Sequence, residues 1–188
     1  LLLLVFGLVS SCTNSDDSEQ VIFAVPEIKS LAELRSNISV ESAQPTNSDG
    51  KIYVTQNYLF YIAQESGIHI FNNTNPTNPQ NIAFINLQGV HDIAVKGNYL
   101  YADNFIDLVV FDISSISNIT LVKIVENAFS FYPTYPEEAE FFDSTDYPEQ
   151  DELIIGYRLE LRNRPSEEVI MALEGSLANF DGSSNYIG

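Results

Sequence analysis

The chain has 188 residues, of which 45% are hydrophobic and 12% aromatic, so it carries enough apolar material for a packed domain and is not a disordered chain. Eight Lys and Arg stand against 26 Asp and Glu, and this net charge of −18 excludes nucleic-acid binding because phosphates would be repelled. Acidity of this size favours solubility and leaves basic partners or divalent cations open, while a single cysteine excludes an intrachain disulfide and a cysteine-based metal cage.

The N-terminal segment indicates export. Residues 1–9 read LLLLVFGLV, which is too short for a membrane span of about 20 apolar residues but has the size of a signal-peptide core. Residues 9–12, VSSC, resemble the lipobox of bacterial lipoproteins, in which the cysteine is lipidated and becomes the new N-terminus. We therefore expect residues 1–11 to be the remnant of a signal peptide and Cys12 to carry lipid. A signal peptide cut elsewhere, with an incidental cysteine, is the alternative.

Residues 12–25 begin as a polar, acidic stretch, and we expect them to form a flexible tether. Ser15-Asp16-Asp17 is similar to the acidic export signal that sends some Gram-negative lipoproteins to the outer face of the outer membrane. A merely acidic tether is the alternative. The expected location is the cell envelope, at the outer membrane and open to surface exposure, with the membrane as a partner through the lipid on Cys12.

Residues 26–49 should lead into the main domain through a helix and a strand. Pro26 suits a first helical turn, and Ile28, Leu31 and Leu34 recur at helical spacing, which predicts a short amphipathic helix over residues 26–35. Residues 38–41 predict an extended strand that could close a ring with a distant blade.

A repeat of about forty residues follows. Residues 52–60, IYVTQNYLF, match residues 93–101, IAVKGNYLY, at five of nine positions with an offset of 41. Residues 67–72, GIHIFN, then match residues 107–112, DLVVFD, with an offset of 40. A match that keeps its order over a whole unit indicates a repeat. We assign one unit to residues 50–89 and a second to residues 90–128.

Each unit contains four short β-type runs, which in the second are residues 92–95, 99–103, 107–112 and 121–125. Gly97-Asn98 supplies the residues that a tight hairpin needs at positive φ. Four strands in forty residues are typical of a β-propeller blade. The predicted fold is all-β, with propeller-like four-stranded blades in an incomplete ring and a short N-terminal helix, because two blades cannot close a ring.

Two stretches of the repeats resemble a known family. GIHIFN at residues 67–72, with the turn NPTNP at residues 75–79, and DLVVFDIS at residues 107–114 resemble the LVIVD repeat, a hydrophobic strand that ends in Asp before an S-x-P-x-x-P-like turn. Ile116 and Ile119 occupy the expected prolines of the second unit. The resemblance covers about residues 50–126 and implies propeller blades and a bacterial surface lipoprotein. It implies no catalytic residues.

The composition changes after the repeats. Residues 129–152 contain many Phe, Tyr and Pro and eight carboxylates, without Lys, Arg or Gly, which predicts an exposed acidic insertion between blades. Its aromatic residues should fold back over a blade, or else form an exposed surface that stacks on sugars or contacts another protein. Residues 153–188 are expected to form a half-buried strand and the start of a further, truncated blade.

The sequence offers no catalytic constellation. His69 and His91 have no second histidine at ligand spacing, so a structural role is expected for both, with no metal and no cofactor. The carboxylates of residues 129–152 lack the spacing of a calcium loop and the rigidity of a glycosidase pair, which favours a solvated loop. We therefore predict a non-catalytic binding or assembly scaffold with an unknown protein or glycan ligand. The alternatives are a glycan hydrolase or lyase with its site in further blades, or a purely structural component.

Overall fold

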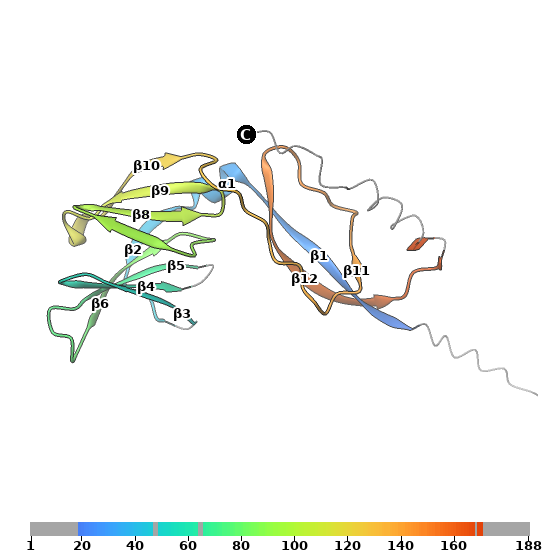
Figure 1. Ribbon diagram of the computed structural model, residues 1–188, viewed down its shortest axis with the longest axis horizontal. Helices are drawn as coiled ribbons and strands as arrows, with labels where there is room; N and C mark the ends of the chain where they lie inside the picture. The colour runs from blue at the N-terminus through green and yellow to red at the C-terminus, as the bar shows by residue number, and fades with distance from the viewer. Residues whose placement is uncertain (1–18, 47–48, 64–65, 168, 171–188) are drawn as a thin grey trace, which may run out of the picture.

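The forty-residue repeat folds into two sheets of the same strand order in the computed structural model, which describes residues 19–46, 49–63, 66–167 and 169–170 (Figure 1). Blade 1 is the antiparallel sheet of β3 (Gly50–Val54), β4 (Tyr58–Ala63), β5 (Gly67–Asn72) and β6 (Gln80–Asn86). Blade 2 consists of β7 (Ile93–Lys96), β8 (Tyr99–Asn104), β9 (Asp107–Asp112) and β10 (Thr120–Val125). The predicted all-β fold with propeller-like four-stranded blades is confirmed.

The cross-strand registers of the two blades are equivalent. In blade 1, Leu59 pairs with Phe71 and Phe60 with Ile70. In blade 2, the residues at the same repeat positions pair in the same way, Leu100 with Phe111 and Tyr101 with Val110. Gly97 has a φ of 59° and lies in the turn between β7 and β8, as its hairpin chemistry predicted, whereas Asn98 does not have the positive φ expected of it.

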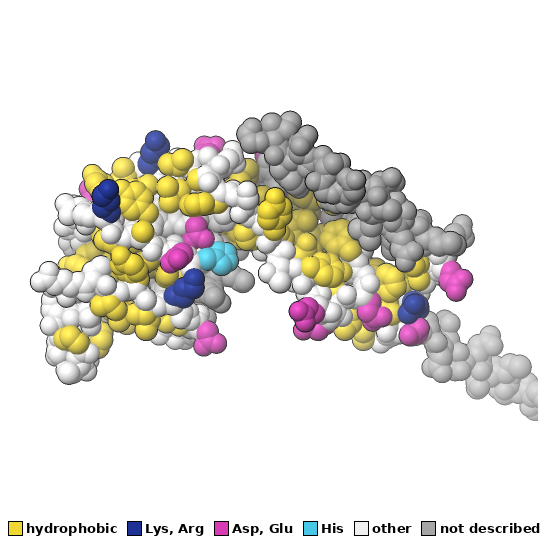
Figure 2. All heavy atoms as spheres, in the orientation of Figure 1, with side chains coloured by type: hydrophobic (Ala, Val, Ile, Leu, Met, Phe, Trp, Pro, Cys, Tyr) yellow, Lys and Arg dark blue, Asp and Glu magenta, His cyan; other side chains and the backbone are white. Residues whose placement is uncertain are grey.

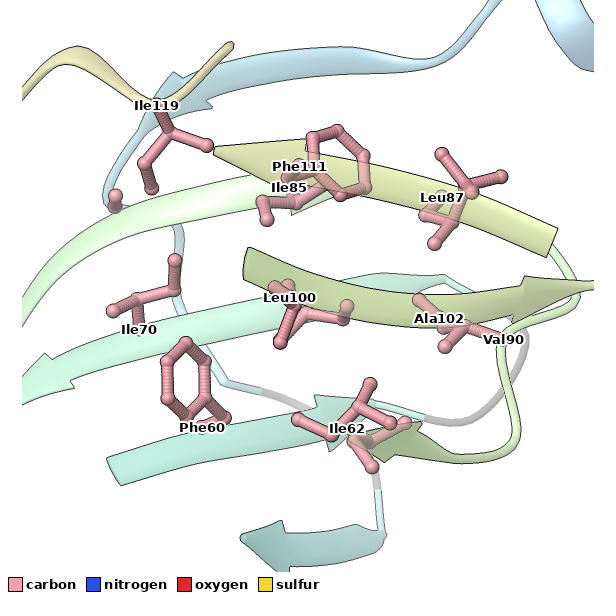
Figure 3. Close-up of a cluster of buried hydrophobic side chains, with 14 residues drawn as sticks. Phe60, Ile62, Ile70, Ile85, Leu87, Val90, Leu100, Ala102, Phe111 and Ile119 are labelled. Atoms are coloured by element: carbon pink, nitrogen blue, oxygen red, sulfur yellow. The ribbon is translucent and has the colours of Figure 1, made fainter. Parts of the chain in front are cut away.

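One hydrophobic core joins the blades. Each blade turns one face of alternating apolar side chains toward the other, and Figure 3 shows these side chains filling the space between the two sheets. The largest buried members are Phe60, Ile62, Ile70 and Ile85 from blade 1 and Leu100 and Phe111 from blade 2. Burial of this apolar area, at about 25 cal/mol per Å², is the main source of stability in this part of the chain.

The segment before the repeats differs from its prediction. β1 (Gln20–Ser30) begins inside the expected tether, and its side chains Val21, Phe23 and Val25 are buried. The helix expected over residues 26–35 is instead α1 (Leu31–Ser36), capped by Ser30, whose Oγ accepts a hydrogen bond from the backbone N–H of Glu33 at 3.1 Å. Both boundaries were wrong because the apolar run of β1 finds a partner strand far away in the sequence.

That partner is β12 (Glu152–Asn163), which pairs antiparallel with β1 over eleven positions. β11 (Phe141–Phe142) adds a short parallel pairing on the other edge of β1, giving the order β11-β1-β12. Pro26 pairs with Tyr157 beyond the end of β11, where the strand has a neighbour on one side and a proline is tolerated. The half-buried strand expected at the start of residues 153–188 is confirmed as β12, which joins this sheet and no blade; the further blade was expected to begin beyond it, and residues 171–188 lie outside the described part.

Two other expectations need correction. β2 (Ser39–Ser42) adds a fifth strand to blade 1 through β6, rather than pairing with a distant blade. Residues 129–152 are not a uniformly exposed insertion between blades, because they run from blade 2 to the three-stranded sheet and contain β11. Asp143 in this segment is buried and accepts hydrogen bonds from Thr145 and Arg162. The 3₁₀ turn η1 (Ile116–Asn118) occupies the place of the proline-rich turn.

Candidate functional site

A hollow of about 380 Å³ lies between blade 2 and the three-stranded sheet, on the concave side where Figure 2 shows apolar side chains from both parts. We call it the aromatic hollow, because it is lined by Phe105, Phe131, Tyr132 and Tyr157. A more open trough of about 610 Å³ adjoins it over blade 2 and shares four of its residues, His91, Phe105, Phe131 and Tyr132. We call this second depression the blade-2 trough.

Phe105 is positioned by the tight turn between β8 and β9. Its φ is 54°, its side chain is buried, and its backbone N–H donates to the carbonyl of Gly89 at 3.4 Å. Gly89 has a φ of 75°, and a Cβ at that position would lie 2.5 Å from the Phe105 ring. Asn104 Nδ2 donates to the carbonyl of Gln88 and joins the same two loops. Position 89 therefore requires a glycine if the Phe105 ring is to pack where it lines the hollow.

The segment after blade 2 supplies the opposite wall. The backbone N–H of Phe129 donates to the carbonyl of Ile106 at 2.9 Å, which holds the start of the segment on the β8–β9 turn. Phe131 packs edge-on against Phe105, with ring centroids 4.9 Å apart. Phe129 and Tyr132 remain exposed. The aromatic residues of this segment therefore divide between the two alternatives, since some fold back and others stay at the surface.

The remaining aromatic residues of the segment pack on the three-stranded sheet. Phe141 stacks on Phe23 with a centroid distance of 5.3 Å, and Tyr135 and Phe142 contact Tyr157 at 5.4 and 6.2 Å. Burial raises the pKa of the Tyr157 hydroxyl, so this wall of the hollow is neutral at physiological pH. These contacts connect the hollow to the core of the three-stranded sheet.

The polar groups that border the hollow and the trough are carboxylates, neutral groups and an imidazole; of these, Asp103 lines the trough and not the hollow. The carboxylate of Asp103 accepts hydrogen bonds from the backbone N–H groups of His91 and Asp92 at 2.9 and 2.8 Å, and its second oxygen lies 3.3 Å from His91 Nδ1. Glu27 is exposed on the opposite side. Among the described residues, no Lys or Arg lines the hollow or the trough. The site therefore suits neutral ring-shaped or cationic groups rather than anions.

A buried ion pair fixes the helix to blade 2 beside this site. Arg35 donates from Nε and Nη2 to the two oxygens of Asp107, at 2.7 and 3.0 Å. Asp107, which is 2% exposed, also accepts a hydrogen bond from the backbone N–H of Asn127 at 2.9 Å. The hydrogen bond to Asp107 raises the pKa of Arg35. Sequence reasoning missed this pair, since its two members lie in different elements and no local pattern connects them.

The two histidines occupy different environments. His69 is buried on the face of blade 1 that points away from blade 2, with the ring of Phe84 4.6 Å away. Burial lowers the pKa of His69, against the effect of a hydrogen bond to the backbone of Gln44. This environment fits the structural role expected for His69. His91 instead lines both the hollow and the trough, so its place at a surface depression was not predicted.

The described residues contain no group of three or more His, Cys, Asp or Glu side chains that could hold a metal ion. Within the same residues, no helix has the length and hydropathy needed to cross a membrane. Cys12, the predicted lipidation site, lies outside the described residues.

Comparison with known proteins identifies the repeat. Residues 89–127 match the LVIVD repeat family, and this range includes all four strands of blade 2. No curated protein and no solved structure matches the chain. Of the two strands that carried the resemblance, β9 lies inside the matched range, with its side chains Val109 and Phe111 in the core between the blades, and β5 lies outside it. The chain therefore contains an LVIVD repeat, at residues 89–127.

Proposed function

We propose that this protein is a lipid-anchored component of the cell envelope, held at the outer membrane, whose blades form a non-catalytic binding or assembly scaffold. Its ligand is a glycan or a protein that enters the aromatic hollow. The observation that carries the proposal is the hollow itself, where rings from three separate segments face one another between two sheets. Rigid aromatic side chains provide large contact areas at low cost in conformational entropy.

The support for a preformed site comes from its backbone contacts. Phe105 is held by the Gly89 loop, and the segment containing Phe131 is held by the hydrogen bond between Phe129 and Ile106. The carboxylate that borders the site, on Asp103, is already occupied by two backbone N–H groups. A carboxylate bound in this way positions its loop and is poorly placed to take up a proton from a reacting group.

Binding through the hollow is tested with the full chain and isolated envelope glycans and proteins. Replacing Tyr132 or Phe131 by alanine should weaken binding about tenfold or more, as expected for central aromatic contacts. Tyr147→Ala is the matched control, because Tyr147 is an exposed aromatic residue that lines neither depression. Equal binding by all three variants would remove the hollow from the proposal. Steady hydrolysis of a glycan by the purified protein would overturn the non-catalytic role.

The anchor is tested separately. Behind a complete signal peptide in a Gram-negative host, the chain should incorporate labelled fatty acid and fractionate with the outer membrane. Cys12→Ala should abolish labelling and release the protein from the membrane fraction, since no other residue offers a thiol. Membrane association that survives Cys12→Ala would contradict the lipid anchor.

A further inference from the structure

The two blades do not pack with equivalent faces. Phe60 and Ile70 of blade 1 are buried against blade 2, yet the residues at the same repeat positions in blade 2, Tyr101 and Val110, lie on the face turned away from blade 1. Conversely, Leu100 and Phe111 are buried between the blades, while their counterparts in blade 1 lie on its far face. The blades therefore stack head to tail, with the front of one repeat on the back of the next.

Head-to-tail stacking leaves two different faces open. We call the face of blade 1 turned away from blade 2 its outer face; it carries Ile52, Val54, Leu59, Tyr61 and Phe71. The outer face of blade 2 carries Tyr101, Leu108 and Val110 and includes the blade-2 trough. By repeat position, the first surface corresponds to the face that blade 2 buries, and the second corresponds to the face that blade 1 buries.

Exposure shows what each outer face lacks. Ile52 is 61% exposed, whereas Ile93, its counterpart in blade 2, is 7% exposed beneath blade 1. Val54 is also exposed, while its counterpart Val95 packs against the core between the blades. Leu108 and Val110 are half-buried, whereas their counterparts Ile68 and Ile70 are fully buried. Isolated exposed apolar residues are ordinary, but a row at positions that the repeat elsewhere buries indicates a missing partner.

We infer that the outer face of blade 1 docks onto the outer face of blade 2 of a second copy of this chain, and so continues the head-to-tail stacking between molecules. One chain carries both halves of this contact, so each copy presents the face that the other copy needs. Residues 50–128 contain three lysines against six acidic residues, so most of the negative charge that would oppose self-association lies outside the blades. Such a heterologous contact closes into a ring or extends as a filament.

Two local features define the contact. Asp103 stands at the repeat position of Ile62; one of its carboxylate oxygens accepts hydrogen bonds from the His91 and Asp92 backbone and the other lies 3.3 Å from His91 Nδ1, which offsets part of the cost of covering this charge. On blade 1, Gln44 covers the region near His69 through its carbonyl, which accepts a hydrogen bond from Asn81 at 2.7 Å. The open part of that face is therefore centred on β3, and Ile52 and Val54 are the residues that would enter the blade-2 trough.

Site-directed disulfide crosslinking of the full chain tests this geometry, in a Cys12→Ser background that removes the native thiol. Chains with Ile52→Cys and chains with Leu108→Cys should crosslink to dimers when mixed, and each variant alone should not. This pattern separates blade docking from association through residues 1–9. Dimers from either variant alone, or none from the mixture, would overturn the inference.

A charge substitution provides the second measurement. Ile52→Lys should lower the association constant of the full chain about tenfold or more at about 0.15 M salt, because an ammonium would lose its water on docking. Leu161→Lys is the matched control, since Leu161 is 63% exposed on β12, outside the blades. Equal effects of the two lysines, or a monomer at all concentrations, would refute docking through the blades. Ligand binding by the aromatic hollow is measured independently, so either proposal can fail alone.

Discussion

The ion pair between Arg35 and Asp107 provides the sharpest stability test. The guanidinium of Arg35 binds both carboxylate oxygens of Asp107 and also reaches Glu126, with 3.0 Å between Nη1 and Oε2. In Arg35→Met, much of the apolar stem is kept, but Asp107 remains buried and, among the described residues, keeps the Asn127 N–H as its one side-chain hydrogen-bond partner. The variant therefore isolates the cost of an uncompensated buried carboxylate.

Removing one partner of a buried pair costs about 3–5 kcal/mol of unfolding free energy. Arg35 is about one-fifth exposed (21%), and one hydrogen bond to Asp107 survives, so we expect a loss of stability just below this range. A loss of about 2–3 kcal/mol corresponds to a melting temperature lowered by roughly 5–10 °C for a chain of this size. The matched control is Arg164→Met, because Arg164 pairs with Glu19 where both side chains are exposed, and such a pair contributes about 0–1 kcal/mol.

Urea unfolding followed by circular dichroism measures both variants. The double variant Arg35→Met/Asp107→Leu adds a further check, because it removes the lone charge and should recover part of the loss. If Arg35→Met cost no more than Arg164→Met, the buried pair would contribute nothing beyond a surface contact. The reasoning from burial and bidentate geometry would then be refuted.

Three further variants test the core, the hollow and the pH dependence. Phe111→Ala should cost about 3–5 kcal/mol in urea unfolding, because Phe111 is fully buried between the blades; a loss below about 1 kcal/mol would show that the blades do not share this core. Gly89→Ala should destabilise more than Gly97→Ala in the same assay, since both have positive φ but only a Cβ at position 89 meets Phe105; equal losses would contradict the close approach. Burial lowers the pKa of His69, so the protein should lose stability as the pH falls below about 6.5, the pKa of histidine in the unfolded chain. Melting temperatures measured between pH 7 and 5 should show this loss, and the loss should be smaller in His69→Phe. The same pH dependence in both proteins would refute this role of His69.

The blades could be predicted from the sequence because their information is local. β9 has the predicted bounds, 107–112. The bounds of the other three strands of blade 2 differ from the predicted ones by no more than one residue at either end. Alternation of apolar and polar side chains sets each strand, and Gly97-Asn98 sets the hairpin, so neighbouring residues carry the signal. Because the two repeat units have the same pattern, the prediction for one unit supports the prediction for the other.

The three-stranded sheet could not be predicted in this way, because β1 and β12 are more than 120 residues apart. The apolar run VIFAVP at residues 21–26 was a signal for a buried strand, but Pro26 was read as a helix start. The aromatic hollow was missed for a related reason. Its walls come from the Gly89 loop, the segment after blade 2 and β12, and only the fold brings them together.

The pairing of β1 with β12 also sets an order of events during synthesis. Strands within each blade contact their immediate neighbours along the chain, so both blades can form before the C-terminal part of the chain is in place. β1 emerges before any of them but must wait for residues 152–163, which are made last among the described strands. Its apolar residues remain without their partner until then, so β1 is open to non-native contacts for longer than the strands of the blades.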